Sequence, residues 1–196
     1  MKHFKITSFL TANLDLDADL IEKMALNCNT LEVKKNSYLI EPGQTCKHIF
    51  FVESGLLRQY TIDAKGKEHN LNFAPENWLI TDRNSLFFNE PTHMFIQALE
   101  DTTVFALNDD FFDEIKSQDY KFSSFNTLLL HKHINRLQQR IISLLSWSAE
   151  ERYLDFIKTY PDLTMRIPQT MISSYLGITP ESLSRVRKEL AQKHKK

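Results

Sequence analysis

The sequence predicts an α+β fold with an antiparallel β-module first, a long helix next and a pair of short helices last. Short apolar runs separated by turn residues fill residues 31–107, and an apolar repeat of helical period follows from about Phe122 to Trp147. A helix-turn-helix pattern lies near the C-terminus. We therefore divide the chain into segments 1–118, 119–147 and 148–196.

A short helix is expected over residues 17–26, before the β-module. The runs expected as strands are 38–40, 49–52, 56–62, 68–73 and 95–107. Pro42-Gly43 suits a type II turn, because proline presets φ at its second position and glycine accepts a positive φ at its third. Strands spaced this regularly indicate an antiparallel sandwich or barrel.

The later part of the chain is predicted to be helical. Asp109 or Asp110 can cap a short helix through Ile115. Ser148 and Glu151 fit a capping box that opens a helix to about Tyr160. Pro161 then ends that helix, because proline lacks the N–H that the next turn needs.

The long helix carries a heptad-like apolar row. Its members, spaced 4-3-4-3, are Leu130, Ile134, Leu137, Ile141 and Leu144. Packing against the rest of the same chain is one interpretation. The opposite face is polar, with Gln138, Gln139 and Arg140, so we favour a seam between two copies of the chain, a homodimer.

Charge is distributed unevenly along the chain. The overall net charge is −1, yet residues 166–196 hold seven Lys or Arg against two Glu. A basic segment at one end favours a polyanionic partner for that end. The alternative is a solvated terminal tail, because Lys193, Lys195 and Lys196 are among the basic residues.

The motif over residues 169–188 decides between these interpretations. Ile172 and Leu176 give a first helix its buried face, Ser173 is small where a second helix passes, and Gly177 suits the left-handed turn. The second helix has its own set of residues: Thr179 as cap, Pro180 at the first position, and Leu183 and Val186 as its buried face. The outward residues of that helix are predicted to enter the major groove of double-stranded DNA.

We assign roles on this basis. Arg185 can donate two hydrogen bonds to guanine, Glu181 can accept one from cytosine, and Ser184 shares their face. The expected phosphate contacts are Thr170, Ser182, Arg187 and Lys188.

Other classes of function find little support. No nucleophile elbow, P-loop, dinucleotide fingerprint or metal-hydrolase signature is present, so no catalytic or metal-ligating residues are assigned and an enzyme is not expected. No apolar run suits a membrane span and no signal peptide is recognisable, which favours the cytoplasm. Cys28 and Cys46 are expected as reduced thiols, and two thiols are too few for an iron–sulfur cluster.

Three segments carry a family resemblance: Ser148-Ala-Glu-Glu-Arg-Tyr-Leu-Asp-Phe-Ile, Ile167-Pro-Gln, and Ser174-Tyr-Leu-Gly-Ile-Thr-Pro-Glu-Ser-Leu-Ser-Arg. With them, nearly the whole chain resembles the Crp/Fnr superfamily of transcription regulators, most of all the short members common in Bacteroidetes. The resemblance implies an N-terminal antiparallel β-roll of the cyclic-nucleotide-binding type, a homodimer, and RNA polymerase as a partner. It places Glu181, Ser184 and Arg185 where the family reads bases, and Pro180 at a position that is often polar there.

The phosphate cassette of that family is altered here. Its Gly-Glu pair falls on residues 80–81 or 81–82, and its Arg-Ser pair on 92–93 or 93–94. Without the arginine a buried phosphate loses a bidentate partner, so we do not expect cyclic AMP as cofactor. A ligand pocket for some other small-molecule effector is assigned to Trp78, Asp82, Arg83, Thr92 and His93. The aromatic residues Trp78, Phe87, Phe88 and Phe95 are interpreted as core, and an apolar pocket lined by them is the alternative.

A ligand-binding sensor with lost or weak DNA binding is the alternative function. It is favoured by the six residues after Leu190, which leave no room for the β-wing of many relatives. The basic tail can replace the contacts of a wing. The effector, the operator and the direction of regulation are left open.

Overall fold

The computed structural model describes residues 4–12 and 14–193. The first residues Met1, Lys2 and His3 and the tail lysines Lys195 and Lys196 lie outside the described ranges. The first two helices are α1 (Lys5–Thr11) and α2 (Ala18–Asn27); the Asp17 side chain caps α2, and this helix confirms the one expected over residues 17–26. Within the described ranges, no helix combines the length and the apolar character needed to cross a bilayer.

Two four-stranded antiparallel sheets make up the β-module. The strands are β1 (Asn29–Val33), β2 (Tyr38–Ile40), β3 (Ile49–Ser54), β4 (Leu57–Ile62), β5 (Glu68–Ala74), β6 (Leu79–Ile80), β7 (Phe95–Ala98) and β8 (Thr102–Leu107). The first sheet has the order β1-β8-β3-β6 and the second β2-β7-β4-β5. Apolar residues of both sheets, such as Phe50 and Val104 from one and Leu57 and Ile96 from the other, pack into one core. The predicted antiparallel β-roll is therefore confirmed.

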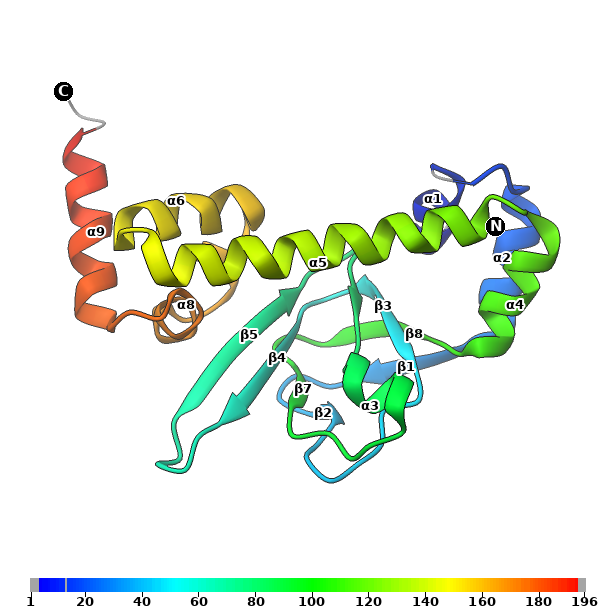
Figure 1. Ribbon diagram of the computed structural model, residues 1–196, viewed down its shortest axis with the longest axis horizontal. Coiled ribbons are helices and arrows are strands. Elements are labelled where there is room, and N and C mark those ends of the chain that lie inside the picture. The colour runs from blue at the N-terminus through cyan, green and yellow to red at the C-terminus, as the bar shows by residue number, and fades with distance from the viewer. Residues whose placement is uncertain (1–3, 13, 194–196) are drawn as a thin grey trace.

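Helices make up the rest of the fold. A short one, α3 (Arg83–Phe88), follows β6. The others come after β8: α4 (Asp109–Gln118), α5 (Phe122–Ser146), α6 (Ala149–Thr159), α7 (Leu163–Arg166), α8 (Gln169–Leu176) and α9 (Pro180–Lys193). Figure 1 shows α5 running along one side of the molecule, from α4 at one end to the α6–α9 group at the other.

The start of α5 is anchored on the outer face of the first sheet. Phe122 and Phe125 join a core that includes Phe51 of β3, Phe105 of β8 and residues of α1 and α2. This core was not foreseen, because α1 lacks the capping and periodic signals that mark α2.

The α6–α9 unit packs against the second sheet through aromatic rings. Phe73 of β5 lies 6.0 Å from Tyr160 and 5.6 Å from Tyr175, measured between ring centroids. The Ser174 hydroxyl donates to the Glu68 carbonyl at 3.0 Å and accepts from the Asn70 N–H at 3.1 Å. The C-terminal helices are therefore docked on the β-roll of their own chain.

Several local predictions are confirmed and others are wrong. The capping box of Ser148 and Glu151 is present as predicted. The cap of α4 is Asn108 rather than Asp109 or Asp110, since the Asn108 side chain accepts from the Phe111 N–H. Phe87 and Phe88 are not core: they are 65% and 71% exposed at the end of α3.

Candidate nucleic-acid interface

Helices α8 and α9 form the predicted two-helix unit. Ile172 and Leu176 of α8 and Leu183 and Val186 of α9 are buried in a shared core. Gly177 joins the helices with φ of 65°, and a Cβ there would lie 3.1 Å from the Leu144 side chain. Glycine adopts that backbone angle at the lowest cost, and a Cβ there would require the Leu144 side chain to shift.

The start of α9 is capped by Thr179. Its hydroxyl accepts from the Ser182 N–H at 3.2 Å, and Pro180 opens the helix where no N–H is needed. Its own backbone N–H and then the Thr179 side chain lower the pKa of Glu181, so this carboxylate is ionised at neutral pH and accepts hydrogen bonds only.

The outward face of α9 lies open to solvent. Glu181, Ser184, Arg185 and Lys188 are exposed, and Arg185 and Lys188 have no ion-pair partner among residues 4–12 and 14–193. The other proposed phosphate contacts lie around them: Thr170 is exposed, whereas Ser182 and Arg187 are half-buried. In Figure 1, α9 lies at the end of the molecule, away from the β-roll. Nothing in the described chain covers the face that would read bases.

Two basic residues of the terminal segment have other roles. Arg166 donates to the carboxylates of Glu76 at 2.9 Å and Glu100 at 2.7 Å, and to the Gly55 carbonyl at 3.2 Å. This cluster joins α7 to turns of the β-roll. Lys193 pairs with Glu150 at the start of α6. The sequence-based charge count therefore overstates the positive charge that is free to meet a polyanion.

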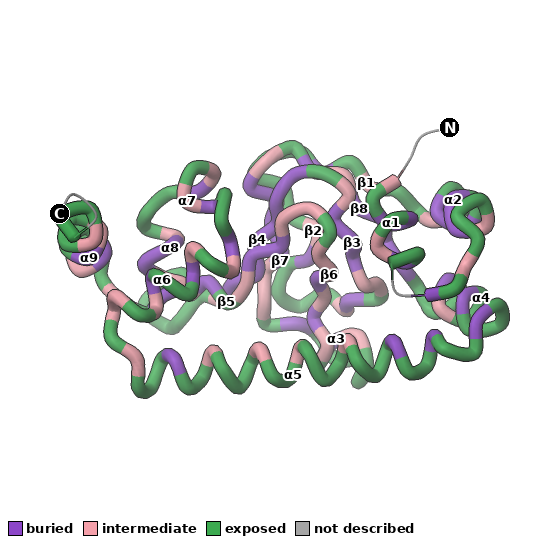
Figure 2. Tube along the Cα trace, turned by 90° about the horizontal axis from the view of Figure 1, so that it is seen from above, coloured by how far each residue is buried: buried purple, intermediate pink, exposed green. Residues whose placement is uncertain are grey.

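The apolar row of α5 is about half exposed to solvent. Its members Leu130, Ile134, Leu137, Ile141 and Leu144 are between 40% and 56% exposed. Figure 2 shows α5 exposed along most of its length, with few buried positions. A contiguous row of large apolar side chains in water marks an interaction surface.

The other face of α5 contacts its own chain through arginines. The Arg140 guanidinium lies 3.7 Å from the ring centroid of Tyr175 and donates to the Tyr175 carbonyl. Arg136 lies 4.7 Å from the ring centroid of Trp78. The expectation that Arg140 belongs to a free polar face is wrong, because its cation stacks on an aromatic ring of α8.

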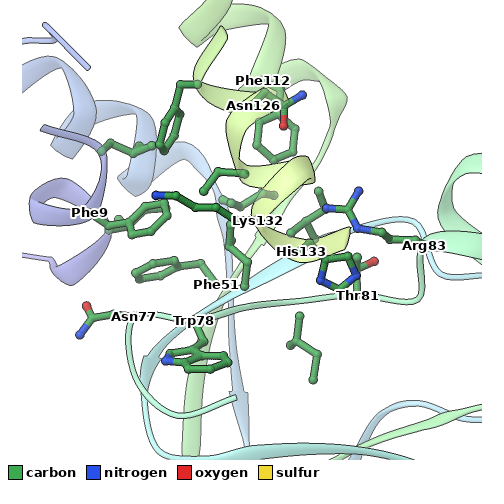
Figure 3. Close-up of a pocket in the computed structure, with 18 of the residues that line it drawn as sticks. Phe9, Phe51, Asn77, Trp78, Thr81, Arg83, Phe112, Asn126, Lys132 and His133 are labelled. Carbon is green, nitrogen blue, oxygen red and sulfur yellow. The ribbon is translucent and has the colours of Figure 1, made fainter. Parts of the chain in front are cut away.

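The five residues assigned to a ligand pocket separate in the structure. Trp78 and Arg83 line a cavity between α5 and the β-roll (Figure 3) that is open to solvent on one side. Asp82 and Thr92 are buried beside it and hydrogen-bond to each other, while Asp82 also accepts from the N–H groups of Asn84 and Ser85. His93 is exposed. Lys132, His133 and Arg136 of α5 also line the cavity, and no sequence motif marked them.

Asp82 and Thr92 lie where the resemblance places the nucleotide cassette. The buried carboxylate of Asp82 would repel an anion, and the Thr92 hydroxyl already donates a hydrogen bond to it.

Cys28 and Cys46 are free thiols. Burial first, and then Glu114, raise the pKa of Cys28 to about 11, so it is protonated at neutral pH. In the described ranges no His, Cys, Asp and Glu cluster suits a metal ion.

The chain combines a two-sheet β-roll, a long helix and an attached helix-turn-helix. Comparison with known proteins finds the same architecture. Residues 30–119 match the family model of the cyclic nucleotide-binding domain. The chain shares its fold with a regulator assigned to the Crp/Fnr family from Eubacterium rectale, at a TM-score of 0.64 and 18% identity over 95% of this chain and 88% of the other. The predicted resemblance to the Crp/Fnr superfamily is confirmed.

Two further proteins are similar to the chain, the first in fold alone and the second in sequence. FixK2 from Bradyrhizobium japonicum has a TM-score of 0.70 at 16% identity, over 85% of this chain and 86% of the other. The anaerobic regulatory protein of Haemophilus influenzae is 27% identical over 165 residues. That match covers 79% of this chain and 63% of the relative, so the chain spans less than two thirds of its relative's length.

Proposed function

We propose that the chain is a homodimeric, sequence-specific DNA-binding transcription regulator. The observation that supports it most directly is the open face of α9, on which Glu181, Ser184 and Arg185 stand together without cover. Proteins similar to it are named as regulators and not as enzymes. The free thiols and the lack of a spanning helix within the described ranges fit a place in the cytoplasm.

In this proposal α9 lies in the major groove. Arg185 donates to guanine O6 and N7, Glu181 accepts from cytosine N4, and Ser184 adds a contact on the same face. Thr170, Ser182, Arg187 and Lys188 contact phosphates and set the position of the helix. The domain division at residues 118 and 147 belongs to the same proposal, with 119–147 as the dimerisation helix.

Two copies associate through the exposed row of α5. Such a dimer has twofold symmetry, so the two α9 helices read half-sites about 34 Å apart on a pseudo-palindromic operator. RNA polymerase is then the partner through which the bound regulator acts on transcription. The altered cassette around Asp82 and Thr92 makes the sensor independent of cyclic AMP.

Selection from a pool of random DNA sequences tests this proposal. We expect enrichment of an inverted repeat whose sequence is the same with and without cyclic AMP. Arg185→Ala should weaken binding to the selected operator by about 1–3 kcal/mol and relax the preference at one base pair of each half-site. Gln192→Ala, an exposed change further along α9, is the matched control and should leave binding unchanged.

The outcomes separate the alternatives. No enrichment from the pool would favour the sensor with lost DNA binding. Enrichment of a single half-site without symmetry would contradict the dimer while leaving the role of α9 intact. Enrichment only in the presence of cyclic AMP would contradict the proposed loss of nucleotide control.

A further inference from the structure

A groove lies between the hairpin of β4 and β5 and the helix-turn-helix unit. Lys67 and His69 line it on the hairpin side, and Thr170, Thr179 and Pro180 line it on the other. Its volume of about 620 Å³ is in the range of ligand sites, so the hairpin and the helices leave space for a partner there. In Figure 1 the hairpin slants toward the end of the molecule that carries α9.

The fold sets the position of the hairpin relative to α9. The two hydrogen bonds of Ser174 hold the start of β5 against α8. The carboxylate of Asp63 orders the turn, because it accepts from the N–H groups of Lys65 and Lys67 at 2.8 and 3.0 Å. Asp63 also pairs with the His69 ring at 2.8 Å. The two lysines of the turn are therefore presented from an ordered backbone beside the reading helix.

The hairpin offers positive charge that is not used within the fold. Among the residues that the structure describes, the ammonium groups of Lys65 and Lys67 have no ion pair and no hydrogen bond, and both residues are exposed. Of the described residues that line the groove, only Glu68 is acidic, and its carboxylate pairs with the buried Arg58. The hairpin side of the groove therefore favours an anionic partner.

The groove is continuous with the surface proposed to bind DNA. When the second helix of such a unit lies in the major groove, the first helix crosses the phosphate backbone. Thr170, at the start of α8, is one of the proposed phosphate contacts, and it also lines the groove. The backbone strand that Thr170 contacts would therefore pass beside Lys67 on the opposite wall.

We propose that the β4–β5 hairpin is a second DNA-binding element, whose Lys65 and Lys67 contact the phosphate strand that runs along the groove. Lysine suits this role, because its ammonium group is a flexible point charge that attracts phosphates without preference for a base. The hairpin adds affinity and salt dependence, and α9 alone reads the sequence. The inference rests on the proposed function, since it requires α9 in the major groove.

Removing both charges tests the hairpin. Lys65→Gln combined with Lys67→Gln should weaken binding to the selected operator by about tenfold or more at physiological salt, and should reduce the slope of log affinity against log salt by about two per bound chain. Non-operator DNA should be weakened equally, because phosphate contacts carry no sequence information. The melting temperature should match that of the parent, since neither ammonium group has a partner in the described fold.

Lys23→Gln combined with Lys116→Gln is the matched control. Both residues are exposed, on α2 and α4, which lie at the opposite end of the molecule from α9 (Figure 1). This control has the same net charge as the hairpin variant, so it measures what a general loss of positive charge does. It should bind DNA with the affinity and the salt slope of the parent.

Uncharged phosphate analogues locate the contact on the DNA. A methylphosphonate can replace one phosphate at a time along the operator. At the phosphates beside the hairpin, the replacement should weaken binding of the parent by about threefold or more and leave the hairpin variant nearly unchanged. At the phosphates contacted by α9, both proteins should lose affinity equally.

Three results would overturn the inference while leaving the proposed function intact. The first is parent-like DNA binding by the hairpin variant. The second is tighter binding by that variant, which would show that the hairpin obstructs the DNA strand. The third is an equal methylphosphonate effect in both proteins at every phosphate. A parent chain that binds no DNA would instead contradict the proposed function and this inference together.

Discussion

The outward faces of α5 and α9 differ in what they offer to a partner. Both helices bury one side in their own chain, α5 through Phe122 and Phe125 and α9 through Leu183 and Val186. Outward, α5 presents leucine and isoleucine, whereas α9 presents carboxylate, hydroxyl and guanidinium groups. An apolar surface gains by leaving water and suits a second copy of itself, while a polar surface suits a hydrated, charged partner such as DNA.

The largest expected effect contrasts a buried and an exposed aliphatic residue. Leu183→Ala should cost about 2–5 kcal/mol of unfolding free energy, because Leu183 is fully buried. Ile141→Ala, at 56% exposure, should cost less than about 0.5 kcal/mol. Urea unfolding in a monomeric Leu137→Asp background measures both without a contribution from association. Equal losses would contradict the distinction between the two faces.

Leu137→Asp tests the apolar face of α5 directly. A carboxylate in each half of the seam should raise the dimer dissociation constant by about 100-fold or more. Sedimentation velocity over a micromolar concentration series measures the change. Gln139→Asp adds the same charge to an exposed position on another side of α5 and should remain dimeric. A parent chain that sediments only as monomer would remove the seam from the proposal.

A third prediction concerns the Arg166 cluster, which joins α7 to turns of the β-roll. Burial raises the pKa of Glu76, but hydrogen bonds from Arg166 and from backbone N–H groups outweigh it, so the net pKa is lowered below 4.5. The stabilising effect is therefore present at neutral pH and lost as pH falls through the folded pKa. Glu76→Gln should cost about 0.5–1 kcal/mol at neutral pH.

The pH dependence of that loss is the check. Urea unfolding of Glu76→Gln and the parent should converge in acid, where Glu76 is protonated in both folded and unfolded chains. Glu41→Gln, at an exposed position in a turn, should match the parent at every pH. A loss for Glu76→Gln that persists unchanged in acid would show that the ion pair with Arg166 is not its cause.

The smallest effect belongs to a single phosphate contact on α9. Lys188→Gln should weaken operator and non-operator DNA alike and reduce the slope of log affinity against log salt by about one. Mobility-shift titrations over a salt series measure the slope. Arg185→Ala serves as the contrast, because it should lower the affinity for the operator more than the affinity for non-operator DNA. A change in base preference for Lys188→Gln would show that Lys188 contacts bases and would contradict its assignment as a phosphate contact.

Sequence reasoning predicted best where one residue type has few alternatives. Gly177, Thr179 and Ser148 each satisfy a local backbone requirement, and the structure places all three as expected. Most strands were also recognisable, because turn residues separate short apolar runs, but β1 and β6 were missed and the run expected over 95–107 is two strands, β7 and β8. These features depend on neighbours within a few positions along the chain.

Features that depend on distant segments were missed. Arg166 looked like part of a basic DNA-facing tail, but its partners Glu76 and Glu100 lie far from it in sequence. His133 and Arg136 line the cavity only because α5 crosses the β-roll near Arg83. The exposure of Phe87 and Phe88 likewise depends on where α3 ends, which composition does not reveal.

Docking of the C-terminal helices through Arg166, Ser174 and Tyr160 has a mechanical consequence. In the proposed dimer, each β-roll and its α9 would move together as one rigid unit about the contact between the two α5 rows. A small rotation near the pivot becomes a larger displacement at the far tip, where α9 lies. The angle between the two rigid units would then set the distance between the two α9 helices, and so the half-site spacing, without bending within either unit.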